Sequence, residues 1–297
     1  MFEASCVCAF GRSWISVLDR DALRSRFPWL SVEGVALGSF GERNEGYFDP
    51  WALLELTRTC ATKLGVRFLK ADALRIERGG VVALADGSQF HAGVVVNAAG
   101  AHAAALFGDE VSPPLPVAPR KRCIFAVSCP LDDDVAAERR RPPKDAPLTI
   151  DPSGVYFRGD LREGRFLCGV SPPADRDPDV LTRAELENVD HSLFEDVIWP
   201  TLANRVPAFE ALRVEASWAG LYEYCTLDQN GIVGNHPTLE GCVVAAGFSG
   251  HGLQHSPGIG RAVAELIDAG KFETIDLEPF GFERILRNEP IFETGIY

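Results

Sequence analysis

Apolar and polar positions along the chain predict three regions of different character. Residues 50–64 carry apolar side chains at helical spacing, with Asp49 as the predicted N-cap and Pro50 in the first turn. Short strands are predicted next, at 66–69, 73–76, 81–84 and 89–91. The apolar run 94–96 is typical of a strand buried on both faces of a parallel sheet, and the small residues that follow predict a tight turn.

The middle of the chain, from residue 113 to about 182, is rich in proline and in alternating segments. Strands at 122–127, 155–158 and 166–170 predict a separate, largely antiparallel sheet. Thr182 and Glu185 have the spacing of a capping box, so residues 182–205 are predicted to be helical. A strand over 214–224 then leads to a hairpin-like turn at Asn230 and Gly231.

The last region returns to the first pattern. A short buried strand at 242–246 feeds the stretch GFSGHGLQHSPGIGRAVAELI, residues 247–267, which holds five glycines and then becomes an amphipathic helix. The order α/β, antiparallel β, α/β predicts one domain interrupted by another, with the final unit returning to the first sheet. The predicted fold class is therefore α/β with mixed α+β character.

Composition and charge exclude several kinds of partner. The net charge of -13 argues against nucleic acid and against anionic membranes, because both bind basic surfaces. The arginine-rich runs 120–122 and 139–141 are interpreted as solvated faces or loops. No apolar run approaches the roughly 18 residues of a membrane span, and the first 14 residues resemble no signal or transit peptide. Eight scattered cysteines show no zinc spacing, so no metal site is predicted.

The glycine-rich stretch is the main candidate for chemistry. A buried strand that ends in glycines places bare N–H groups at the carboxyl edge of a sheet, where α/β folds bind ligands. Missing Cβ atoms also let a large planar or phosphorylated ligand approach the backbone closely. The pattern fits a cofactor site and an ordinary glycine turn equally well, so both interpretations stay open on these grounds.

Three segments resemble one family. Residues 247–260 resemble the C-terminal flavin-contacting segment of the D-amino-acid oxidase and sarcosine oxidase family of FAD-dependent oxidoreductases. VVVNAAGAHAAAL, residues 94–106, resembles its strand and turn near the flavin, and EGYFDPWALL, residues 45–54, resembles its helix start. Longer matched runs cover nearly the whole chain and are most similar to a mitochondrial branch implicated in the assembly of respiratory complex I.

The resemblance implies a fold and a cofactor. It implies an FAD-binding doubly wound domain, residues 47–111 and 237–297, interrupted by an antiparallel substrate domain with helices, residues 1–46 and 112–236. Family members pass a hydride equivalent from the C–N bond of an amine or amino acid to the flavin. FAD would be noncovalent here, because the cysteine that tethers flavin in sarcosine oxidases falls at Leu221.

The resemblance also implies site residues. Tyr222, Tyr224 and Gln254 are the catalytic candidates that would face the substrate, although the tyrosines also suit a structural role and Gln254 could cap a turn. His251 is not expected to act as a base. The cofactor-binding candidates are Leu74, Ala99, Gly100, Gly247, Phe248, Ser249, Gly250, His251, Gly252, Leu253 and Gln254.

Two departures from the family pattern lower the expected activity. The sequence has no GxGxxG motif for the FAD diphosphate, so we expect a truncated form or isoform that lacks the first βαβ unit. Strands 94–96 and 242–246 should then border exposed apolar sheet surface, with low stability and weak FAD binding. The lysine and histidine that some family members place near the flavin fall close to Leu167 and Ser171.

Three functions therefore stay open. The first is a flavoprotein of the mitochondrial matrix or inner membrane surface, with complex I subunits or assembly intermediates as partners. The second is an amine or amino-acid oxidase or dehydrogenase that acts on CH–NH bonds. The third is a flavin-free, protein-binding remnant of the fold.

Overall fold

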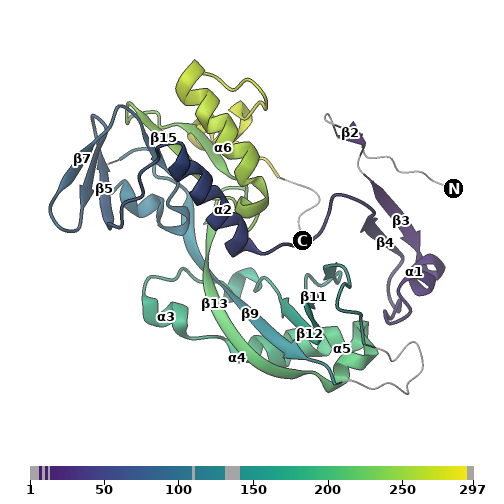
Figure 1. The fold of residues 1–297 in the computed structure, drawn as a ribbon. Helices are drawn as coiled ribbons and strands as arrows, with labels where there is room; N and C mark the ends of the chain where they lie inside the picture. Colours follow the sequence, from purple (N-terminus) through teal and green to yellow (C-terminus); the bar gives the residue numbers. More distant parts are fainter. Residues whose placement is uncertain (1–6, 9–10, 13, 109–110, 131–140, 293–297) are drawn as a thin grey trace.

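The computed structural model describes residues 7–8, 11–12, 14–108, 111–130 and 141–292 (Figure 1). The expectations for the first six residues and for Arg139 and Arg140 lie outside this part of the chain. The described residues form a mixed α/β structure with several small sheets and one larger antiparallel sheet. None of the helices in the described part is long and apolar enough to cross a bilayer.

The largest sheet is built around two long strands. β9 (Val117–Ser128) pairs antiparallel with β13 (Arg213–Cys225) along nearly its whole length. Three further strands complete the order β10-β11-β12-β9-β13, all antiparallel, which confirms the predicted antiparallel sheet. They are β10 (Thr149–Ile150), β11 (Tyr156–Asp160) and β12 (Arg162–Gly169).

One face of this sheet carries the larger core. Alternate residues of a strand point to opposite faces, so Phe125, Phe157 and Phe166 lie together, each at most 1% exposed. Phe209 packs on Phe157 and Phe166 from the covering layer of helices. That layer comprises α4 (His191–Leu193), the π-helical η5 (Phe194–Ile198), α5 (Trp199–Arg205) and η6 (Pro207–Ala211). It is preceded by η4 (Ala174–Arg176) and by α3 (Arg183–Glu187), which has no buried residue.

The continuous helix predicted over 182–205 is wrong, although its start is right. Thr182 and Glu185 form the predicted capping box. The helix then ends at Asn188, whose ψ of 96° is extended, and Asp190 starts a new helix by accepting the Ser192 N–H at 3.1 Å. Local capping therefore divides the segment into separate turns, each of which can pack differently on the sheet.

A smaller sheet holds the end of the chain, in the order β14-β15-β8. β15 (Cys242–Ala246) lies in the middle, antiparallel to β14 (Ile232–Asn235) and parallel to β8 (Val95–Asn97). α6 (Gly252–Ala269) packs on it through Ala262, Val263 and Leu266. Two short elements follow, η7 (Glu278–Phe280) and α7 (Phe282–Arg287).

Three expectations for this smaller sheet need correction. Residues 94–96 are not buried on both faces, because Val94 and Val96 are each 40% exposed. β15 does not border an open edge, since it has a neighbour on either side, whereas β8 is the outer strand of the described sheet. Asn230 and Gly231 do not close a hairpin, because β13 and β14 belong to different sheets.

β9 and β13 connect the two parts of the molecule. Their middle residues lie in the larger core, whereas Val117 and Cys225 lie in a second core beside Val244 of β15. Figure 1 shows the two strands running from the lower helices up to the region below α6. The last residues of β13 are thereby placed beside the glycine-rich stretch.

The remaining elements lie to either side. β5 (Ala73–Glu77), β6 (Val81–Leu84) and β7 (Gln89–His91) form the predicted meander, which contacts η2 (Ala104–Leu106). At the other side, α1 (Arg20–Arg26) connects the paired strands β3 (Ile15–Asp19) and β4 (Leu37–Gly41). Two short strands precede them, β1 (Val7–Cys8) and β2 (Gly11–Arg12).

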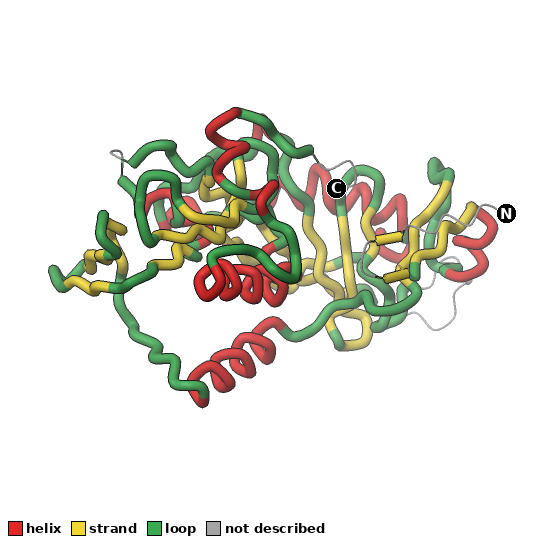
Figure 2. The backbone as a smooth tube through the Cα atoms, turned by 90° about the horizontal axis from the view of Figure 1, so that it is seen from above, coloured by secondary structure: helices red, strands yellow, loops and turns green. Residues whose placement is uncertain are grey.

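Helix α2 (Pro50–Lys63) confirms the predicted helix, but its side chains do not pack into a core. Asp49 caps it, accepting the N–H groups of Trp51 at 2.9 Å and Ala52 at 3.2 Å, and Gly65 follows its end with a φ of 95°. No residue of α2 is buried. Figure 2 shows the helix apart from its neighbours. The strand predicted at 66–69 is absent, because this exposed segment has no pairing partner.

Candidate functional site

The glycine-rich loop between β15 and α6 has an unusual backbone. Gly247, Ser249 and Gly250 have φ values of 80°, 45° and 88°, in the left-handed region. A Cβ on Gly250 would lie 2.6 Å from Cε2 of Tyr222, and one on Gly247 would lie 2.8 Å from Cγ2 of Val117. Both positions therefore require glycine for its φ and for space.

The outer edge of β13 holds this loop. The Ser249 N–H donates to the Glu223 carbonyl oxygen at 3.0 Å, and Ser249 Oγ accepts the Cys225 N–H at 3.0 Å. The Tyr222 hydroxyl donates to the Ser249 carbonyl oxygen. Ser249 is only 3% exposed, so the loop is fixed at its centre while Gly250 stays open to solvent.

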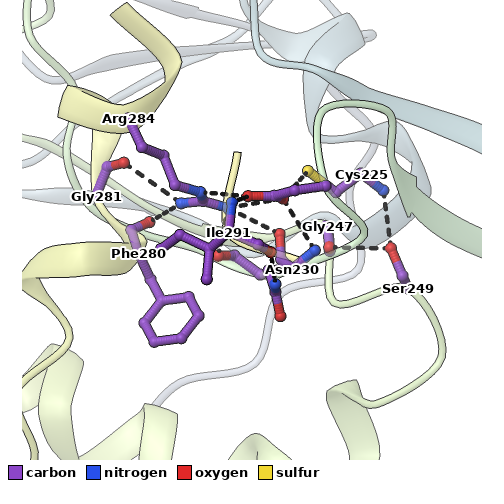
Figure 3. A network of polar contacts seen from close by, with 10 residues as sticks. Cys225, Asn230, Gly247, Ser249, Phe280, Gly281, Arg284 and Ile291 are labelled. Carbon is purple, nitrogen blue, oxygen red and sulfur yellow. Dashed lines mark hydrogen bonds and ion pairs between the residues drawn. The ribbon is translucent and has the colours of Figure 1, made fainter. Parts of the chain in front are cut away.

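A buried ion pair supports the turn behind the loop (Figure 3). Arg284 Nε donates to Asp228 Oδ2 at 2.9 Å, and its other nitrogens donate to carbonyl oxygens of the 230–231 and 280–281 segments. Asp228 also accepts the N–H groups of Asn230 at 3.1 Å and Ile291 at 3.0 Å. The Cys225 thiol donates to Asp228 at 3.4 Å, which connects this network to the strand that holds Ser249.

The turn after β8 brings the second predicted segment to the loop. Asn97 is 1% exposed, its side-chain amide donates to the Ala103 carbonyl oxygen at 2.9 Å, and its Oδ1 accepts the Ala99 N–H at 3.3 Å. Gly100 has a φ of 55° and begins η1 (Gly100–His102). The buried asparagine therefore fixes the turn that presents Ala99 and Gly100.

The Glu223 carboxylate lies between these two segments. Its Oε2 accepts the Gly247 N–H at 2.9 Å and would lie 3.7 Å from a Cβ on Gly100. Its Oε1 would lie 2.9 Å from a Cβ on Gly252. Burial raises the pKa of Glu223, and the N–H groups of Gly247 and Phe248 offset part of that rise. Glu223 was not among the residues predicted from the sequence. The one signal for it is that it lies between Tyr222 and Tyr224 on a predicted strand, which places its side chain on the opposite face from theirs.

The other side of the loop lines a groove of about 440 Å³. Phe248, His251 and Gln254 face it, together with His255, whose ring stacks on His251 at 5.7 Å between centroids. Its floor is apolar and comes from Val233, Ile259, Ile275, Leu277 and Phe280. The predicted loop residues are thus divided between this groove and the contacts of the Glu223 carboxylate.

Tyr222 and Tyr224 lie on the opposite face of β13 from Glu223, beside two arginines. The Arg122 guanidinium is 4.2 Å from the Tyr222 ring centroid and pairs with Asp177 at 2.7 Å. Arg120 lies 5.2 Å from the Tyr224 ring centroid and pairs with Asp179. The interpretation of residues 120–122 as a solvated face is wrong for both arginines, since their side chains are 20% exposed or less.

Three further predicted residues lie as follows. Ala99 is half-buried beside Gly100, whereas Leu253 is 49% exposed at the start of α6. Leu74 lies on β5, in a separate sheet, and is 59% exposed. The structure thus brings Ala99 and Gly100 to the glycine loop, but it leaves Leu74 outside that group.

Part of the implied cofactor site is brought together around Glu223. Gly100 and the glycine loop, the two segments that the resemblance places at the flavin ring, both lie against its carboxylate, and Val117 and Glu223 occupy the space beside Gly247 and Gly252. The sequence has no GxGxxG motif to hold the diphosphate. Among the described residues, no group of three His, Cys, Asp or Glu side chains could hold a metal ion.

Comparison with known proteins identifies the family. The pattern of the FAD dependent oxidoreductases, the DAO family, matches residues 5–266. The chain belongs to this family. It is 41% identical to FAD-dependent oxidoreductase domain-containing protein 1 of Xenopus laevis over 95% of the chain, and 40% identical to that of Bos taurus over 93%. The predicted resemblance is thereby confirmed. The chain spans about 60% of the length of these curated relatives.

Solved structures support the DAO fold. L-proline dehydrogenase from P. horikoshii matches with a TM-score of 0.75 at 22% identity, covering 93% of this chain and 70% of that one. Glycine oxidase from Geobacillus kaustophilus matches with a TM-score of 0.66 at 23% identity, covering 91% and 67%. The mixed α/β fold with antiparallel sheets is therefore that of the DAO family. The domain boundaries and FAD binding by this chain stay predictions.

Proposed function

We propose that this chain is the ring-binding part of a mitochondrial FAD-dependent oxidoreductase that takes part in the assembly of respiratory complex I. The observation that carries the flavin part is the approach of Gly100 to the glycine loop, with the Glu223 carboxylate in contact with both segments. Membership of the DAO family supports FAD as the ligand. The similarity over nearly the whole chain to FAD-dependent oxidoreductase domain-containing protein 1 supports the biological role.

The residues of the site have distinct tasks in this proposal. When bound, the flavin would accept a hydride equivalent. Gly247 and Gly250 let the loop pack closely against Val117 and Tyr222, and Ser249 keeps the loop in position through β13. Tyr222 fixes the same loop through its hydroxyl group, so its first task is to position the loop.

Two measurements test the proposal. FAD binding is tested on the purified chain by equilibrium dialysis, together with a flavin absorbance spectrum of the protein as isolated. We expect weak, noncovalent binding, since the GxGxxG motif is absent from the sequence. Failure to bind FAD at any concentration would refute the flavin part.

The assembly role is tested in cells of the source organism from which the gene has been deleted. Native gels of mitochondrial membranes should show less assembled complex I, and expression of the protein should restore it. A normal amount of complex I in the deleted strain would refute this role, whatever the outcome of the FAD measurement.

Amine oxidation is the second candidate function, and the layer of arginines and tyrosines on β9 and β13 favours it. Arg120, Arg122, Tyr222 and Tyr224 form an aromatic and basic surface on one face of the sheet. A substrate carboxylate, as in an amino acid, would bind there in place of Asp177 or Asp179, the carboxylates with which the two arginines pair. Reduction of bound flavin under anaerobic conditions by a panel of N-methyl amines and amino acids tests this function directly.

A further inference from the structure

The groove beside the first turns of α6 has the size of a small-molecule site. Its volume of about 440 Å³ lies in the range of about 300–1,000 Å³ that such sites have. The Arg284 guanidinium holds one wall, because it donates to the carbonyl oxygens of Asn230 and Gly231, each at 3.0 Å. Val233 and Leu277 belong to the core beneath α6 and are 1% and 7% exposed. Packed elements therefore form the groove without a ligand.

The floor of the groove is apolar, and two glycines shape it. A Cβ on Gly231 would lie 2.3 Å from Cδ1 of Phe248, so the Phe248 ring lies directly against the backbone there. A Cβ on Gly258 would lie 3.4 Å from Cδ1 of Ile275, so a longer side chain at 258 would fill part of the groove. A hydrocarbon group laid on this floor would gain the free energy of burying apolar surface on both partners.

The rim of the groove offers hydrogen bonds but no permanent charge. Among the described residues that line it, none is Asp, Glu, Lys or Arg. The side-chain amides of Gln229 and Gln254 make no hydrogen bond within the described part of the chain, so their donors are available to a ligand. His251 and His255 are the titratable side chains of this lining, and their rings stack at 5.7 Å between centroids with an interplanar angle of 20°. A bound cation would meet no carboxylate in the lining, whereas a bound anion would meet two imidazoles.

Most charged groups on the surrounding elements are paired with one another. The pairs are Asp228 with Arg284 and Arg261 with Glu265, each at 2.9 Å, Arg287 with Glu283 at 2.8 Å, and Lys271 with Glu273 at 3.7 Å. The other carboxylates of these elements stand outside the lining, and they are Glu223, Asp268, Asp276 and Glu278. The two histidines are therefore the groups through which pH changes the charge of the groove lining.

We propose that this groove is a second ligand site that takes an apolar carboxylic acid: the hydrocarbon lies on the floor, and the carboxylate accepts hydrogen bonds from the rings of His251 and His255. Histidine side chains in general change charge between about pH 5 and about pH 8. Two protonated imidazoles one helical turn apart repel each other, and a carboxylate that contacts both replaces this repulsion with two attractions. Binding therefore takes up protons at the rings and strengthens as the pH falls, with no covalent step. The inference goes beyond the proposed flavin site and does not depend on it.

The test compares three probes that share one hydrocarbon chain: octanoate, octan-1-ol and octylamine. Their binding to the full chain is measured by isothermal titration calorimetry at about pH 6 and about pH 8. The Kd of octanoate should be about tenfold lower at the lower pH, the alcohol should bind more weakly with a Kd independent of pH, and the amine should not bind. Absence of octanoate binding at the lower pH, or binding of the alcohol or the amine as tight as that of octanoate, would overturn the inference.

Two pairs of variants locate the binding site. Gly258→Leu fills the groove and should abolish octanoate binding, whereas Gly260→Leu, where a Cβ meets nothing within 4 Å, should bind like the wild type. Both changes raise helix propensity, so both proteins should keep α6. The double variant His251→Gln with His255→Gln should lose the pH dependence, and His91→Gln, exposed on β7, should keep it. Unchanged binding in Gly258→Leu, or an unchanged pH dependence in the double variant, would overturn this inference and leave the proposed flavin site standing.

Discussion

The buried Arg284–Asp228 pair offers the sharpest test of how the site is supported. The two side chains are 4% and 0% exposed, so Arg284→Met would leave the Asp228 charge buried with only N–H and thiol donors. Removing one partner of such a pair costs about 3–5 kcal/mol. Whole domains are stable by about 5–15 kcal/mol, so Arg284→Met should lower the midpoint of urea unfolding markedly.

A double-mutant cycle separates loss of the pair from loss of packing. Asp228→Asn should also destabilise, but the double variant should be less unstable than the sum of the single variants, because neither charge is then left alone. Arg183→Met is the matched control. The side chains of Arg183 and Glu187 are 89% and 62% exposed, so removing this pair should lower the free energy of unfolding by less than about 0.5 kcal/mol. Additive effects in the cycle, or a loss below about 1 kcal/mol for Arg284→Met, would refute the reasoning.

The same ion pair should make the free energy of unfolding depend on pH in the acidic range. Burial alone would raise the pKa of Asp228, but hydrogen bonds from Arg284 and from the N–H groups of Ile291 and Asn230 hold it below its usual value. The pair's contribution is therefore complete above the ordinary Asp pKa of about 3.9 and is lost as the pH falls through the lower pKa of the folded state. Asp228→Asn should remove this part of the acid sensitivity.

Three further predictions concern single side chains. Gly250→Ala should lower the free energy of unfolding in urea by about 1–3 kcal/mol, because the new Cβ would meet Tyr222 and the φ of Gly250 is positive. Gly260→Ala is the matched control: a Cβ there meets nothing within 4 Å, so this variant should stabilise α6 by about 0.5–1 kcal/mol. Equal effects would contradict this. Tyr222→Phe keeps the ring but loses the hydrogen bond to Ser249, so thermal unfolding should show a loss of about 1 kcal/mol, and an unchanged stability would argue against that bond. Burial lowers the pKa of His236, so only the unfolded state takes up its proton just below pH 6.5, and the unfolding free energy should fall as the pH drops from about 6.5. His236→Asn should weaken that dependence, and an identical pH profile would exclude His236 as its source.

Local signals explain what could be predicted. Asp49 and Pro50 at the start of α2, and Gly65 after its end, are short-range capping signals and gave the helix correctly. The glycines at 247 and 250 marked a left-handed turn between a strand and a helix, which the structure contains. Such features depend on neighbouring residues only, so the sequence displays them directly.

The rest depends on residues far apart in the chain. Glu223 and Gly100 are brought together by the packing of η1 on β13, and nothing in either local sequence indicates that contact. Arg284 and Asp228 lie 56 residues apart. Arg122 was read as solvated because its neighbours are basic, but Asp177 pairs with it across the fold. Contacts between residues far apart in the chain therefore determine which side chains meet at the site, and the periodicity of a sequence does not predict such contacts.

Helix α2 has a consequence for how the protein behaves in solution. An isolated helix of about 12–15 residues is marginal in water, and α2 has 14 residues with none buried. Its hydrogen bonds should therefore open at almost no cost, and its amides should exchange with solvent much faster than those of α6. A protease added to the native protein should cut first within α2 or at the exposed residues just after it, long before it reaches the sheets.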